Sequence, residues 1–186
     1  MKNAFEVDAS VTPLMPAAQL YFSGMTFTFN PHRMIFNRVT DCAQVLEDGT
    51  TLPIEDEKLY RVVTGLYCGQ MLGAVNDKSF GILNITPRDA QGNEITNLED
   101  FILHDKNGNE LKEWYALASY LGDMGTVSGE YGRPEGRKIV DNSWSPTHLL
   151  TNLNGISIAV LAAALVLILI VVALVCRIIR RRKHPQ

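Results

Sequence analysis

The chain has 186 residues, of which 46% are hydrophobic and 20% charged, a composition that argues against a disordered or low-complexity protein. Before position 177 it holds 12 basic and 20 acidic residues, an excess of acid that disfavours nucleic acid as a partner because phosphate binding needs clustered Lys and Arg. Three cysteines are too few for a disulfide scaffold, and none lies in a CxxC or Cys/His cluster typical of a metal site.

The clearest strand pattern lies in the first third of the chain. Residues 25–29 alternate between Met or Phe and Thr, which is typical of a half-buried strand, and residues 30–32 form a turn after it. Residues 36–45 predict a weaker strand. Residues 46–50 predict a hairpin turn in which Gly49 supplies a positive φ.

The middle of the chain mixes strand and helix signals. Three segments are β-rich, and two turns flank the last of them; the predicted strands are residues 58–64, 80–86 and 101–104, and the turns are residues 91–93 and 106–109. Residues 67–75 predict a short helix or a loop with two glycines. Residues 110–121 carry an apolar stripe at helical spacing that ends near Gly122.

Strands lead and a helix follows, so the predicted fold class is α+β. We divide the chain into a soluble domain over residues 1–126 and a juxtamembrane linker over residues 127–154, which is rich in Gly, Pro and Ser in its first part. A transmembrane helix is expected over residues 155–176. Residues 177–186 form a basic tail.

The apolar run of residues 155–176 is uncharged and, as an α-helix, would span roughly 33 Å, enough for a hydrocarbon core of about 30 Å. Five basic residues follow it at once. The positive-inside rule therefore predicts a single-pass protein of the cell membrane, with its tail in the cytoplasm and its domain outside. Cys176, at the inner end of the run, is either a palmitoylation site or one more apolar residue, and we favour the second interpretation.

Residues 1–20 contain no apolar stretch of the kind that forms a secretory signal. A domain of this size is hard to translocate ahead of a C-terminal span without one. The simplest interpretation is that the sequence is the C-terminal piece of a longer secreted and anchored protein. The alternative is a complete short protein.

Motifs of known catalytic machinery do not occur in the sequence: there is no P-loop, no HExxH and no GxSxG. The four histidines are scattered, and we interpret each as a surface or structural residue. Cys42 and Cys68 pair only if the fold brings them together, which the sequence leaves open. From its residues alone, the domain is a binding module without catalytic residues, metal ligands or a cofactor of its own.

Several short segments keep the order and spacing of a known domain; they are residues 23–29, residues 37–41, Gly49, Leu52-Pro53 and residues 59–64. From about Leu20 to Thr64 the chain resembles the C-terminal domain of the bacterial 5′-nucleotidase/2′,3′-cyclic phosphodiesterase family. The resemblance implies a partner domain, an N-terminal metallophosphoesterase domain that carries divalent metal ions and the catalytic His–Asp pair.

In that family the C-terminal domain supplies two aromatic rings that sandwich the nucleobase. By position these rings correspond to Phe22 and Tyr67, and stacking on an aromatic face is worth ~1–3 kcal/mol per base. The alternative is that both are core aromatics of two strands. Family members follow the second ring with a Gly-Gly-Asp-Gly-type loop, whereas residues 71–74 read Met-Leu-Gly-Ala and contain no carboxylate.

The resemblance therefore implies the nucleotide-recognition domain of a hydrolase, a membrane-anchored 5′-nucleotidase-type phosphoesterase in nucleotide catabolism. The expected partners are a nucleotide or related phosphate ester, the lipid bilayer and the N-terminal domain, but no nucleic acid. This chain alone is expected to be inactive. The competing hypothesis is a non-catalytic surface ectodomain that binds a protein or a glycan.

Overall fold

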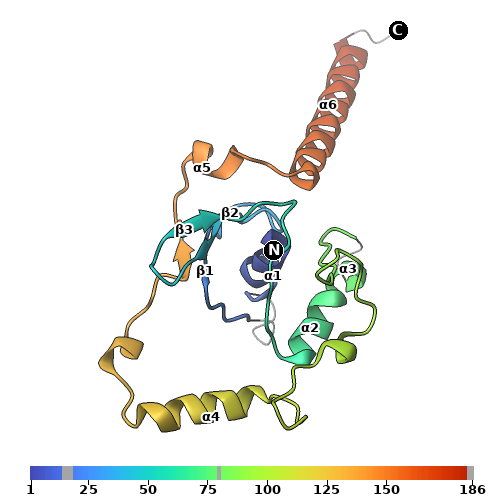
Figure 1. Ribbon diagram of the computed structural model, residues 1–186. Coiled ribbons are helices and arrows are strands. Elements are labelled where there is room, and N and C mark those ends of the chain that lie inside the picture. The colour runs from blue at the N-terminus through green and yellow to red at the C-terminus, as the bar shows by residue number, and fades with distance from the viewer. Residues whose placement is uncertain (14–18, 79–80, 184–186) are drawn as a thin grey trace.

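A small sheet forms the centre of the protein, and its strands run in the order β3-β2-β1-β4. The structure is a computed structural model, and it describes residues 1–13, 19–78 and 81–183. One helix lies against the sheet, and the other helices lie farther from it, toward both ends of the molecule (Figure 1). The predicted α+β fold class is confirmed.

Strands β1 (Met25–Phe29) and β2 (Val39–Val45) pair antiparallel, with Phe27 opposite Cys42. The alternating residues of β1 confirm the strand predicted there. β2 begins later than predicted, because Phe36 has a φ of 63°, a left-handed conformation that a strand does not accommodate. The residues before Val39 therefore belong to the connection between the two strands.

Strand β3 (Thr51–Pro53) follows β2 through the predicted hairpin turn. The backbone N–H of Leu46 donates to the carbonyl of Thr50 at 2.9 Å, which closes the turn. Gly49 has a φ of 82°, as the turn requires. The hairpin turn is confirmed.

Strand β4 (Lys138–Val140) was not predicted. It pairs parallel with β1, with Phe27 opposite Lys138, and comes from the stretch expected to approach the membrane irregularly. Three residues are too few to show a periodicity, and their partner lies more than a hundred positions away. Only the long-range pairing identifies them as a strand.

Helix α1 (Lys2–Val11) covers the sheet on one face (Figure 1). Its residues Phe5 and Ala9 form the core together with Phe27 of β1 and Val39 of β2, and all four are buried. Burial of such apolar side chains contributes about 25 cal/mol per Å² of area removed from water. No helix was predicted for these residues.

Two carboxylates on α1 are also buried. Glu6 accepts hydrogen bonds from the backbone N–H groups of Arg38 at 3.1 Å and Val39 at 2.7 Å. Asp8 accepts from the N–H of Leu20 at 2.8 Å and forms an ion pair with Lys138. These bonds fasten α1 to the start of β2 and to β4, and they compensate the cost of burying charge.

The strand predicted over residues 58–64 is wrong. This segment is irregular and its apolar residues are largely exposed, with 72% of the Val63 side chain accessible. The sheet ends at β3 and β4, and this β-rich segment pairs with neither of these edge strands.

Two further strand predictions fail. Residues 81–86 form no strand, and Phe80, where this prediction began, lies outside the described residues. Residues 98–101 instead form a 3₁₀ turn, η2 (Leu98–Phe101). Within the predicted strand 101–104, His104 forms an isolated bridge with Glu110 across the predicted turn.

Helices α2 (Leu66–Gly73), α3 (Val75–Lys78) and α4 (Glu113–Met124) fill the middle of the chain. α2 agrees with the predicted helix or loop, and α4 confirms the helical stripe.

α4 starts three residues later than predicted because Glu110 and Leu111 pair back onto the preceding segment. It ends at Gly125, whose φ is 68°. A 3₁₀ turn, η3 (Gly129–Gly132), leads on toward β4.

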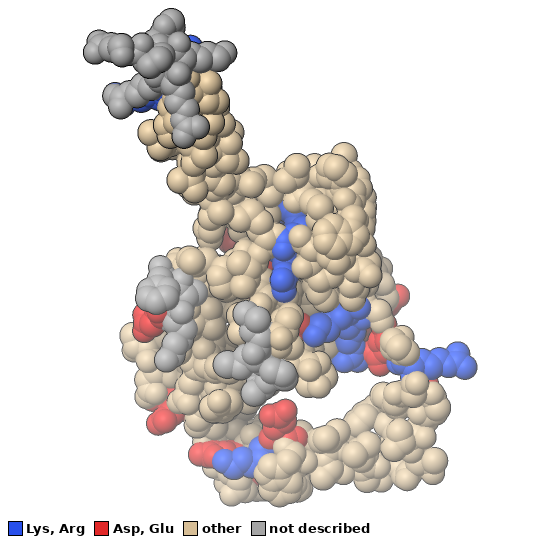
Figure 2. Space-filling view, turned by 180° about the vertical axis from the view of Figure 1, so that it is seen from behind, with Lys and Arg blue, Asp and Glu red and all other residues tan. Residues whose placement is uncertain are grey.

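Helices α5 (Pro146–Leu150) and α6 (Gly155–Lys183) end the chain. Over Gly155–Arg180, α6 is long and apolar enough to cross a membrane. α6 projects from the rest of the molecule, and its surface is uncharged except for basic side chains near its C-terminal end (Figure 2). α4 lies at the opposite end of the molecule from α6 (Figure 1).

Candidate functional site

The first predicted ring, Phe22, lies just before β1 and is half-buried. Its centroid is 4.9 Å from that of Phe5 and 5.6 Å from that of Phe27, the second in an edge-on arrangement. Such pairs are worth about 0.5–1.5 kcal/mol beyond the area they bury. Phe22 therefore contributes to the core, although the residue as a whole is only partly buried.

The second predicted ring, Tyr67, lies in the first turn of α2 and is 79% exposed. Among the ring contacts of the described residues, none joins it to Phe22. Tyr21, which precedes Phe22, is 87% exposed. The family position selected Phe22 rather than Tyr21, but only the packing on Phe5 shows which of the two faces the core.

Two glycines let α2 pack closely against its neighbours. A Cβ added at Gly65 would lie 2.9 Å from a carboxylate oxygen of Glu113, at the start of α4. At Gly69 the nearest atom would be a methyl carbon of Leu98, at 3.3 Å. The close approach of α2 to η2 thus helps to set the position of Tyr67.

The end of α2 occupies the place of the Gly-Gly-Asp-Gly-type loop. Met71 and Leu72 continue the helix, which ends at Gly73. The nearest following carboxylate, Asp77, belongs to α3. Helix α2 itself therefore contains no carboxylate after Tyr67.

The cysteines are free thiols in the structure, so the pairing of Cys42 with Cys68 that the sequence left open is not formed. Cys42 packs against the core, and burial raises the pKa of its thiol. No group of three His, Cys, Asp or Glu side chains that could hold a metal occurs among the described residues.

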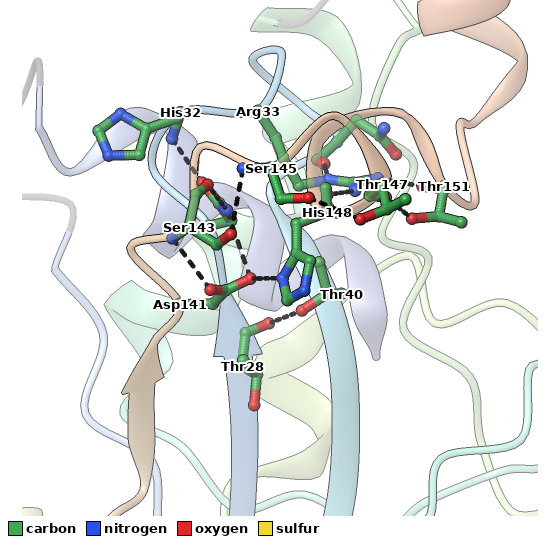
Figure 3. Close-up of polar contacts among 12 residues, drawn as sticks. Thr28, His32, Arg33, Thr40, Asp141, Ser143, Ser145, Thr147, His148 and Thr151 are labelled. Carbon is green, nitrogen blue, oxygen red and sulfur yellow. Dashed lines mark hydrogen bonds and ion pairs between the residues drawn. The ribbon is translucent and has the colours of Figure 1, made fainter.

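A second set of polar residues lies where the sheet meets the segment leading to α6 (Figure 3). We call it the junction cluster; its residues are Asn30, His32, Arg33, Asp141, Trp144 and His148. Arg33 is only 5% exposed and donates hydrogen bonds to the carbonyls of Asn37, His148 and Thr151. Burial lowers the pKa of its guanidinium, an effect that nearby Glu6 and Asp141 oppose.

Two of the four histidines, His32 and His148, belong to this cluster. His148 pairs with Asp141 at 2.8 Å, and this hydrogen bond holds the pKa of the Asp141 carboxyl below its usual value. The His32 ring stacks on Trp144 at 3.9 Å between centroids. In the described part of the chain, no Ser or Cys side chain hydrogen-bonds to the His148 ring, so the pair does not form a nucleophilic triad.

The comparison with known families concerns the site predicted at Phe22 and Tyr67. Residues 1–76 match the family model for the 5′-nucleotidase C-terminal domain. The match extends from α1 through β3 and α2, includes both Phe22 and Tyr67, and ends before β4. It covers less than half of the chain. No curated protein and no solved structure matched the chain.

Proposed function

We propose that this chain recognises the nucleotide for a membrane-anchored 5′-nucleotidase-type phosphoesterase. The observation that carries the proposal is the family match over residues 1–76, which includes an aromatic residue exposed at the start of α2. Catalysis would come from an N-terminal metallophosphoesterase domain, whose divalent metal ions would activate water and polarise the phosphate. Residues of this chain would bind and orient the base.

Tyr67 is the ring that we propose stacks on the base, because its face is accessible and α2 holds its backbone in place. Phe22 is the proposed second ring, and it would contribute the accessible part of a side chain otherwise packed on Phe5 and Phe27. Stacking tolerates different bases, since each base has a π-face. The missing carboxylate after α2 would leave selectivity for the base weak.

Titration with adenosine 5′-monophosphate, followed by NMR, tests this role in the full chain in detergent. Tyr67→Ala should weaken binding about 5- to 150-fold, the equivalent of a lost stack of ~1–3 kcal/mol. Ribose 5-phosphate, which lacks a base, should bind the variant and the original chain equally. Tyr115→Ala, at another exposed tyrosine, is the matched control and should change neither affinity.

Equal affinity of Tyr67→Ala and the original chain for the nucleotide would contradict the assignment. Phe22→Ala separates binding from packing: a core role alone lowers the melting temperature while the ratio of the two ligand affinities stays constant. The chain alone should hydrolyse neither compound with added Mn²⁺, Zn²⁺ or Co²⁺. Turnover that a point mutation in the chain abolishes would overturn the two-domain proposal.

We further propose that α6 anchors the protein in the cell membrane with its C-terminus in the cytoplasm. Support comes from its length, its uncharged surface and the basic residues at its end. In native membranes, protease added from outside should digest the domain and spare the tail. A protected domain with a digested tail would reverse the orientation and remove the extracellular role.

The competing function, a non-catalytic ectodomain that binds a protein or a glycan, is favoured by one observation. Residues 113–123 of α4 are all exposed, and among them are Trp114 at 69% and Tyr115 at 58%. Aromatic residues of this kind are enriched at binding hot spots. This function predicts no base-dependent binding, so the nucleotide titration distinguishes it from the first.

A further inference from the structure

The segment between β4 and α6, residues 141–154, does not behave as a free connection. We call it the juxtamembrane segment. Along its length it is hydrogen-bonded to the β1–β2 loop, residues 30–38, which lies more than a hundred positions earlier in the chain (Figure 3). The sequence alone predicted a linker here.

Arg33 makes the central contact. Its guanidinium donates to the carbonyls of His148 and Thr151 at the C-terminal end of α5, the second at 2.8 Å. Charge-assisted hydrogen bonds of this kind are stronger than neutral ones, and a cation is favoured at the negative end of a helix. Because Arg33 is almost fully buried, its donors have lost water and depend on these carbonyls.

Two asparagines on the loop hold the two ends of the segment. Asn30 is fully buried and donates to the carboxylate of Asp141 at 3.3 Å and to the carbonyl of Ser143 at 2.8 Å. Asn37 accepts from the backbone N–H of Asn154 at 3.3 Å. The segment is thereby fixed where it leaves β4 and where it enters α6.

Asn154 connects the loop directly to α6. Its side-chain amide donates to the carbonyl of Phe36 at 2.7 Å, and its side-chain oxygen accepts from the N–H of Ser157 at 2.9 Å. The same side chain thus caps the first turn of α6 and binds the loop. Ser157 is 1% exposed, so the base of α6 is packed into the domain.

We propose that the β1–β2 loop is a clasp that holds α6 at a fixed angle and distance to the sheet. A flexible connection over residues 141–154 would have an r.m.s. length of about 20 Å and a maximal reach of about 50 Å. With the clasp closed, the domain cannot move through that volume. The consequence for the membrane rests on the proposed anchor: the nucleotide-binding face stays at a constant height above the bilayer.

Electron–electron distance measurements on the full chain test the clasp. Spin labels are placed at Leu52→Cys on β3 and Ile158→Cys on α6, both exposed positions, after each native cysteine is replaced by Ala. The original junction should give one narrow distance distribution. Arg33→Ala should broaden it by on the order of 20 Å, as expected for a released flexible segment.

Arg33→Lys should also broaden the distribution, because an ammonium group does not reproduce the fixed fork of a guanidinium. The matched control is Arg61→Ala, at an exposed arginine outside the junction, and it should leave the distribution narrow. If circular dichroism shows that Arg33→Ala does not fold, Asp141→Asn combined with His148→Ala opens the segment from its other side. That double variant should broaden the distribution too.

A broad distribution with the original junction would overturn the clasp, as would narrow distributions in all folded junction variants. Failure of the anchor gives a different result: the chain does not float with lipid vesicles, while the distance measured in detergent stays narrow. Failure of nucleotide recognition appears in the titration and leaves both other measurements unchanged.

Discussion

Two regions of the protein contain apolar residues of the same kind but bury them to different extents. In the sheet region, formed by α1 and β1–β4, Phe27 is 1% exposed and its neighbours come from segments far apart in sequence. In the outer region, residues 58–132, α2 contacts η2 and α3, and Trp114 on α4 is 69% exposed. Apolar spacing thus predicts an element without predicting its burial.

The acidic residues of the two regions differ in the same way. Glu6 and Asp8 in the sheet region are buried and bind groups from distant segments. In the outer region, Asp89 and Asp105 lie in two similar exposed turns and bind residues within four positions. Hydrogen bonds from Asn93 and Asn109, respectively, lower the pKa of these two carboxyls. Local sequence is sufficient for the second arrangement but not for the first.

The largest expected effect comes from truncating the core. Phe27→Ala should lower the free energy of unfolding by about 3–5 kcal/mol, because it leaves a cavity among Phe5, Phe22 and Val39. Trp114→Ala on α4 should change it by less than about 0.5 kcal/mol. Urea denaturation of the soluble part within the full chain, in detergent, measures both. A larger loss for Trp114→Ala would mean that α4 is buried in solution.

Breaking an ion pair should also cost more stability in the sheet region than in the outer region, although both costs should be smaller than that of Phe27→Ala. Lys138→Ala removes the partner of Asp8, whose side chain is 1% exposed, and should cost about 2–3 kcal/mol, since the lysine itself is partly solvated. Lys112→Ala removes the exposed partner of Glu110 and should cost about 0–1 kcal/mol. Equal costs, measured by the same denaturation, would contradict the distinction between the regions.

Glycine substitutions should give effects of opposite sign in the two regions. Gly49→Ala should destabilise by about 1 kcal/mol, because its φ of 82° is unfavourable for a side chain. Gly73→Ala at the end of α2 should stabilise by about 0.5 kcal/mol, since a Cβ there meets open space and the unfolded chain loses freedom. Melting temperatures compare the two variants, and a loss of stability in both would show that Gly73 is constrained by packing.

Acid should loosen the junction cluster, and this is the smallest expected effect. The pKa of Asp141 is lowered in the folded state, so its contribution is present above the ordinary Asp value of about 3.9 and is lost as pH falls through the folded value. Hydrogen exchange of the Ser143 N–H, which donates to this carboxylate, should accelerate over that window. Asp141→Asn should remove this pH-dependent change in the exchange rate. A change that persists in the variant would assign it to another titrating group.

The sequence alone predicts the elements that depend on neighbouring residues. The alternation in β1, the turn around Gly49, the stripe of α4 and the uncharged run of α6 each lie within one short segment, and the strand, the turn and both helices are confirmed. For the candidate site it identified Phe22 and Tyr67 through a family pattern, and the family match over residues 1–76 includes both positions. It did not show that Phe22 packs on Phe5, because nothing local marks α1 as the cover of the sheet.

Which segments pair with one another was visible only in the folded protein. Residues 58–64 have strand composition and form no strand, whereas the short β4 takes the sheet edge beside β1. Arg33, an ordinary basic residue in sequence, is buried because carbonyls at the end of α5 are brought to it. A hydrogen-bond ladder or a buried charge needs a specific partner, and the free energy of that pairing depends on groups that the local sequence does not contain.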